Sequence, residues 1–166
     1  MMQSSDIQLQ VVLRALSDVV APALGGSEKH VIEQFHLSLV TLQFLKTRMP
    51  DQRRFQRMEL RAYMELATGV ADIAGDATTS DLRARVALAQ EVLDDPEKDI
   101  ADYEAANRGL REAVTALSNA VTGTPSQTAV NTLILERHGA IADQARVWCL
   151  PFGFELEPEK LAAPAW

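Results

Sequence analysis

The stretch that decides the fold is residues 100–121, which read IADYEAANRGLREAVTALSNAV. Its regular positions alternate spacings of three and four residues, at Ile100, Tyr103, Asn107, Leu110, Val114, Leu117 and Val121. This spacing predicts an α-helix with a seam of the coiled-coil type.

Asn107 occupies a seam position where an apolar side chain is expected. A single asparagine in such a seam can fix the register and the partner number of a helical interface. Two interpretations follow, a dimer contact through this helix or an intramolecular core in which Asn107 pairs with His138 or a serine.

Similar patterns predict five further helices, separated by glycines, prolines and capping residues. Their expected ranges are about 6–20, 28–49, 52–73, 81–93 and 127–148. The dipeptide Asp95-Pro96 is expected to start the helix that contains residues 100–121. The sequence therefore predicts an all-α fold, a single-domain bundle of five to six helices over residues 1–150, with an extended, proline-containing tail over residues 151–166.

The helix over residues 28–49 is apolar on two sides. At about 100° per residue, one stripe contains Val31, Phe35, Leu39 and Leu42, and a nearly opposite stripe contains Leu37, Val40 and Phe44. Such a helix is expected at the centre of the bundle or in a subunit interface.

Composition excludes several classes of protein. The 166 residues carry a net charge of -7, which opposes non-specific binding to nucleic acid. No apolar run approaches the roughly 20 residues of a membrane span, and the amino-terminal stretch has no basic leader region. The single Cys149 excludes an intrachain disulfide and a cysteine-rich zinc site, so we expect a cytoplasmic protein without nucleic-acid or membrane partners.

Basic residues gather between positions 46 and 61, at Lys46, Arg48, Arg53, Arg54, Arg57 and Arg61. Arg54, Arg57 and Arg61 share one helical face, and arginine side chains bind phosphates and carboxylates with two hydrogen bonds. This face is a candidate ligand site for a small or CoA-like anion. Alternatively, it is solvated or attracted to the acidic run Glu91, Asp94, Asp95, Glu97, Asp99, Asp102 and Glu104.

Two histidines are candidates for chemistry. Glu33 and His36 have the Glu-x-x-His spacing found in helical bundles that bind two metal ions through carboxylates. Such a site needs a second motif of this kind, which the sequence lacks, so no metal is expected. We expect the pair to lie at a half-exposed edge of its helix. His138 lies on the stripe of Ile134 and Ile141 and is expected to face the core, where it would be either a catalytic acid or base or a hydrogen-bonded structural residue. Cys149 ends a helix, where the dipole disfavours a thiolate, and no nucleotide, hydrolase or zincin motif predicts a cofactor.

The opening of the chain resembles small helical bacterial proteins of unknown function encoded near aminoglycoside-phosphotransferase-like kinases and acyl-CoA dehydrogenases. The similar residues are Leu13, Leu16, Val19, Pro22, Ala23, Leu24, Gly25 and His30, with the later stretches Asp81-Leu82-Arg83 and Asn107-Arg108-Gly109-Leu110. The resemblance covers about half of the chain and implies a setting in acyl-CoA or xenobiotic catabolism. It supplies no active site, and the expected tail departs from it.

Two functions are consistent with these patterns. The first is a non-catalytic accessory or interaction module that forms a homodimer or presents a helical surface to a partner enzyme. The alternative is a small enzyme or carrier that holds an anionic, CoA-like ligand through Arg54, Arg57 and Arg61, with His138 as acid or base. The two differ in whether these groups converge on one apolar pocket.

Overall fold

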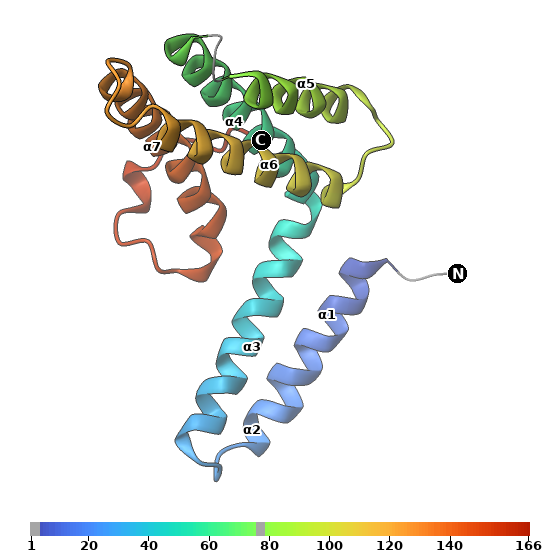
Figure 1. Ribbon diagram of the computed structural model, residues 1–166. Helices are drawn as coiled ribbons and strands as arrows, with labels where there is room; N and C mark the ends of the chain where they lie inside the picture. Colours follow the sequence, from blue (N-terminus) through green and yellow to red (C-terminus); the bar gives the residue numbers. More distant parts are fainter. Residues whose placement is uncertain (1–3, 76–78) are drawn as a thin grey trace. The chain divides into compact units, whose positions relative to one another are not determined.

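The computed structural model describes residues 4–75 and 79–166, and within these ranges it contains helices and no strand (Figure 1). The all-α prediction is confirmed. The long helices are α1 (Ser5–Ala15), α3 (Lys29–Arg48), α4 (Gln52–Ala74), α5 (Ser80–Asp94), α6 (Ile100–Ala120) and α7 (Gln127–Cys149). The short elements are η1 (Leu16–Val20), α2 (Ala21–Ala23), η2 (Met49–Asp51), η4 (Leu150–Phe152) and η5 (Pro158–Lys160).

The chain forms two compact units. One, the hairpin unit, contains the residues up to Pro50 together with Trp148–Pro158. The other, the core unit, contains Asp51–Val147 and Glu159–Trp166. The division into a bundle over residues 1–150 and a tail over residues 151–166 stays a prediction. No helix in the described part of the chain has both the length and the apolar character needed to cross a membrane.

In the hairpin unit, α1 and α3 lie side by side and run in opposite directions (Figure 1). The hydroxyl of Ser4 caps α1 by accepting a hydrogen bond from the backbone N–H of Ile7 at 3.4 Å. An ion pair of 3.8 Å joins Asp6 near the start of α1 to Lys46 near the end of α3. Leu13 is the only large apolar side chain that the described part of this hairpin buries.

In the core unit, α4, α5 and α6 pack around one apolar cluster. The seam predicted for residues 100–121 is confirmed from Tyr103 onward, because its members Tyr103, Asn107, Leu110, Val114, Leu117 and Val121 are all buried. We call these six residues the α6 seam. Helix α7 contributes Val130 and Ile141 to the same cluster.

One position expected for the second helix is wrong. Of the two expectations for residues 28–49, the central position is contradicted, because α3 buries none of its residues, whereas α4 and α6 each bury seven. A place in a subunit interface stays a prediction. The stripe of α3 that includes Phe35 and Leu39 is only half-buried. The opposite stripe is covered at Phe44, whose ring stacks on Phe152 at 4.1 Å, while Leu37 and Val40 remain exposed.

The helix of the α6 seam also begins later than expected. Asp95-Pro96 forms a turn, in which the Asp95 carboxylate accepts the backbone N–H of Glu97 at 2.9 Å. Asp99 and Asp102 then form a reciprocal cap, since the carboxylate of each accepts the backbone N–H of the other at 3.1 and 2.9 Å. This pair satisfies two amide groups at once, so α6 begins at Ile100.

After α7 the chain contains two short 3-10 turns, η4 and η5. The positive φ of 74° at Gly153 ends η4 in the left-handed region that glycine adopts without strain. Within the core unit, the ring of Trp166 meets the ring of Phe55 edge-on at 5.3 Å, and the side chain of Gln144 donates to the carbonyl of Ala163 at 3.3 Å. Residues 151–166 are thus anchored at several points.

The α6 seam should dominate stability. Replacing the fully buried Leu110 with alanine leaves a cavity in the cluster and is expected to lower the free energy of unfolding by about 3 kcal/mol. Leu88→Ala on the exposed face of α5 is the matched control and should change it by no more than about 0.5 kcal/mol. Urea titrations followed by far-ultraviolet circular dichroism compare the two, and equal losses would contradict this description of the core.

Candidate functional site

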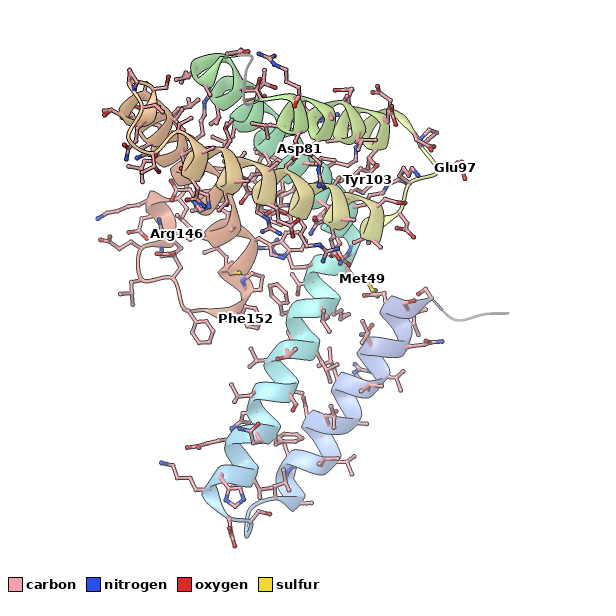
Figure 2. The ribbon with its side chains drawn as sticks, in the orientation of Figure 1. Met49, Asp81, Glu97, Tyr103, Arg146 and Phe152 are labelled. Carbon is pink, nitrogen blue, oxygen red and sulfur yellow. The ribbon has the colours of Figure 1, made fainter. Side chains whose placement is uncertain are left out.

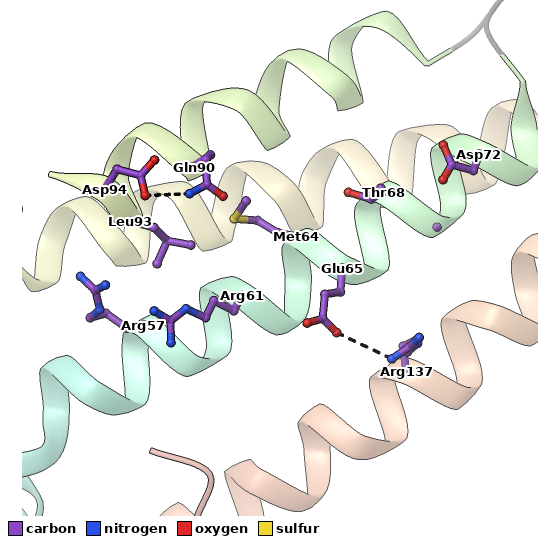
Figure 3. Close-up of a pocket in the computed structure, with 11 residues that line it drawn as sticks. Arg57, Arg61, Met64, Glu65, Thr68, Asp72, Gln90, Leu93, Asp94 and Arg137 are labelled. Atoms are coloured by element: carbon purple, nitrogen blue, oxygen red, sulfur yellow. Dashed lines mark hydrogen bonds and ion pairs between the residues drawn. The ribbon is translucent and has the colours of Figure 1, made fainter.

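A groove in the core unit contains two of the three arginines predicted as a ligand site. Arg57 and Arg61 line it, together with residues of α4, α5 and α7, and its volume is about 640 Å³. Figure 3 shows Arg57 and Arg61 at the same end of this groove as Leu93 of α5. The complete lining is Arg57, Arg61, Met64, Glu65, Thr68, Gly69, Asp72, Gln90, Leu93, Asp94 and Arg137. We call it the α4–α5 groove.

Arg54 lies outside this groove. Its guanidinium instead pairs with Asp51 at 3.4 Å, one turn earlier on the helix. Helical spacing predicts that the three arginines share one face of α4. It does not predict which part of that face lines a groove with a neighbouring helix, so the position of Arg54 could not be predicted. The rest of the basic stretch is also dispersed, since Arg53 donates to the carbonyl of Pro96 at 2.6 Å and Lys46 belongs to the hairpin unit.

Tyr103 holds Arg57 in place. The guanidinium of Arg57 donates a hydrogen bond of 2.8 Å to the Tyr103 hydroxyl and lies 5.6 Å from the centre of its ring. Tyr103 is fully buried, so its hydroxyl needs a partner, and Arg57 supplies it. The sequence showed Tyr103 only as an apolar member of the seam and gave no sign that its hydroxyl would orient an arginine.

A second polar cluster lies where α6 packs against α4. The amide of Asn107, which is 1% exposed, donates to Gln56 and to Glu59, each at 3.3 Å. Asn107 is therefore intramolecular, and its predicted role in a dimer contact is wrong. Its expected partners, His138 or a serine, are also wrong, because two polar residues of α4 take that place. The Asn107 carbonyl oxygen has no hydrogen-bond partner within the described residues.

Burial changes the ionisation of this cluster. The pKa of Glu59 is raised above its ordinary value of 4.5, chiefly by loss of solvent; Arg111 lowers the pKa and Glu104 raises it further. The pKa of Tyr63 is raised for the same main reason, against the lowering effect of Arg111. Glu59, Gln56 and Tyr63 were not singled out from the sequence, although all three share the spacing of the buried row of α4.

His138 does not face the core as expected. It is exposed, and its ring lies 6.5 Å from that of Tyr63. Helix α7 buries only Val130, Ile141 and Val147, so a position beside its apolar stripe stays open to solvent. The catalytic or structural role of His138 remains untested.

The remaining candidates do not assemble into a site. Glu33 and His36 are exposed, and Glu33 pairs with Lys29 at 3.5 Å. Within residues 4–75 and 79–166, no group of three or more histidine, cysteine, aspartate or glutamate side chains has the arrangement of a metal site. Cys149 is exposed and forms no disulfide.

Comparisons with protein-family models, with curated proteins and with solved structures found no match. The resemblance to proteins encoded near acyl-CoA dehydrogenases therefore remains a prediction. The groove itself supplies guanidinium, carboxylate, amide, hydroxyl and thioether groups.

The raised pKa of Glu59 predicts a pH-dependent stability. As pH rises, the unfolded chain loses the Glu59 proton before the folded chain does, so the contribution of this residue to folding falls between its ordinary pKa and its raised pKa. Glu59→Gln keeps an oxygen for Asn107 and removes the ionisation. We expect the stability of this variant relative to the wild type to increase as pH rises above the ordinary pKa of Glu59, and to level off once the folded wild type is also ionised.

Urea titrations at several pH values measure this difference. Glu65→Gln is the control, because Glu65 is an exposed residue of the same helix. A difference between Glu59→Gln and the wild type that stays constant with pH would contradict the prediction.

Proposed function

We propose that this chain is a cytosolic helical interaction module that associates with a second copy of itself through the hairpin of α1 and α3. The observation that carries the proposal is the exposed apolar surface of this hairpin. Figure 2 shows side chains extending outward on both sides of it. The exposed large apolar residues are Ile7, Val11, Val12, Val19, Val20, Val31, Leu37, Val40, Leu45 and Met49.

A hairpin of this kind gains little stability from its own contacts. Isolated helices of this length are marginal in water, and most helical stability in proteins comes from burying an apolar face. Burial of one leucine or valine contributes about 1.5–3 kcal/mol, and here almost all of these side chains still face solvent. Patches of this type on an α-helical surface mark sites of association.

The charges at the two ends of the hairpin support a second copy as the partner. The end near the turn between α2 and α3 carries three acidic residues, Asp18, Glu28 and Glu33, and one lysine, Lys29. The opposite end carries Lys46 and Arg48 against Asp6.

An antiparallel, two-fold arrangement of two hairpins places each acidic end beside a basic end. The four helices then form a bundle, a common way for amphipathic hairpins to cover their apolar faces. The Leu37 and Val40 stripe of α3 would lie inside it, which accounts for the two-sided apolar pattern of this helix. A partner enzyme with a matching helical surface would occupy the same face.

Leu37→Glu tests the interface. Because Leu37 is 55% exposed in the single chain, the charge should leave the monomer folded but prevent burial of this face, and association should weaken by at least tenfold. Leu88→Glu is the matched control, since Leu88 is 56% exposed on α5 of the core unit. Light scattering coupled to size-exclusion chromatography reports the mass, with twice the single-chain mass expected for the wild type and for Leu88→Glu.

Two results would overturn the proposal. One is a wild-type chain that keeps the mass of one chain throughout the micromolar range. The other is equal weakening of association by Leu37→Glu and Leu88→Glu, since this would place the contact outside the hairpin.

A further inference from the structure

Two positive charges at one end of the α4–α5 groove form no ion pair within the described residues. Arg57 and Arg61 are four residues apart on α4, a spacing at which like charges on a helix repel each other. Arg57 is held by the neutral hydroxyl of Tyr103. Arg61 is exposed and has no hydrogen bond or ion pair among the described residues.

The acidic residues of the groove are engaged elsewhere. Glu65 pairs with Arg137 at 3.7 Å, and Asp72 pairs with Arg83 at 3.2 Å. Asp94 accepts a hydrogen bond of 2.8 Å from the side chain of Gln90 (Figure 3). Glu65 and Asp72 are therefore paired with other arginines, and Asp94 is held by a neutral amide, so none of the three carboxylates forms an ion pair with Arg57 or Arg61.

Apolar groups lie beside the arginine pair. Leu93 is buried and belongs to the apolar cluster, and the partly buried Met64 packs against the same cluster. In Figure 3 both lie next to the arginine end of the groove. Gly69 lines the groove further along α4, where the side chain of Leu133 packs so closely that a Cβ at Gly69 would lie 2.8 Å from it. The volume of about 640 Å³ falls within the range of small-molecule sites, roughly 300–1,000 Å³.

We infer that this groove binds a small amphiphilic carboxylate, with its head group at Arg57 and Arg61 and its apolar body over Met64 and Leu93. A guanidinium group matches a carboxylate through two parallel hydrogen bonds. Tyr103 pre-orients Arg57, which lowers the entropy lost on binding. This inference rests on the core unit and is independent of the association of the hairpins.

The charge balance of the lining favours one negative charge over several. Besides its three arginines, the lining contains the three carboxylates of Glu65, Asp72 and Asp94. A polyphosphate longer than the arginine end would bring its further charges toward these carboxylates. A single carboxylate with an apolar tail avoids this repulsion, so an aliphatic acid suits this lining better than CoA does.

Octanoate is the probe for this site. In a titration followed by backbone amide chemical shifts, octanoate should move the signals of Thr68, Gly69 and Gln90, which line the groove. Affinity should increase about two- to fourfold per methylene from acetate to octanoate, because each methylene leaves water.

Arg61→Gln should weaken octanoate binding about tenfold, the loss expected for one charge-assisted hydrogen bond. Arg54→Gln is the matched control, since Arg54 lies one turn before Arg57 on the same helix and outside the groove. It should bind octanoate as the wild type does. Both arginines are exposed, so circular dichroism should show both variants folded.

Three results would overturn the inference. The first is that acetate, inorganic phosphate or CoA binds as tightly as octanoate. The second is that octanoate shifts signals only in the hairpin unit. The third is that Arg61→Gln and Arg54→Gln change the affinity equally.

Discussion

The structure depends on the packing of the α6 seam against α4. Tyr103 and Leu110 are fully buried there, and their contacts hold α4, α5 and α6 in one cluster. Burial of Tyr103 also creates a requirement, because its hydroxyl must find a donor or acceptor away from water. Arg57 meets this requirement, and in doing so it is fixed at one end of the α4–α5 groove. The core and the candidate ligand site are thus linked through this hydrogen bond and through Leu93, which belongs to both.

The buried row of α4 differs along its length. Its amino-terminal part presents Gln56 and Glu59 to Asn107, whereas its carboxyl-terminal part presents Leu66 and Val70 to the apolar cluster. A polar pair inside a helical interface costs stability but disfavours other registers, because a shift of one turn would place Asn107 against an apolar side chain. The Glu59 carboxylate adds to this cost when it is ionised, as its raised pKa indicates.

The sequence predicted the all-α class and the seam because a spacing of three and four residues is a local property of one helix. The sequence did not correctly predict the burial of residues that depends on which other helices pack against them. The two apolar stripes of α3 indicated a central helix or a subunit interface, but α3 packs on α1 and, near its carboxyl end, on Trp148 and Phe152. For His138, the apolar stripe of α7 predicted burial. The helix buries only Val130, Ile141 and Val147, so His138 remains exposed. Two members of the predicted site, Arg57 and Arg61, were placed together correctly, while Arg54 on the same face lies outside the groove.

The two units handle their apolar residues in different ways. In the core unit, α4 and α5 pack against α6 and bury its seam within one chain. In the hairpin unit, two antiparallel helices can cover only the row between them, which contains Leu13. The remaining valines and leucines can be covered only by another surface. The two ends of the hairpin carry opposite charge excesses, and the association proposed above would use both of these features, the open apolar faces and the charged ends.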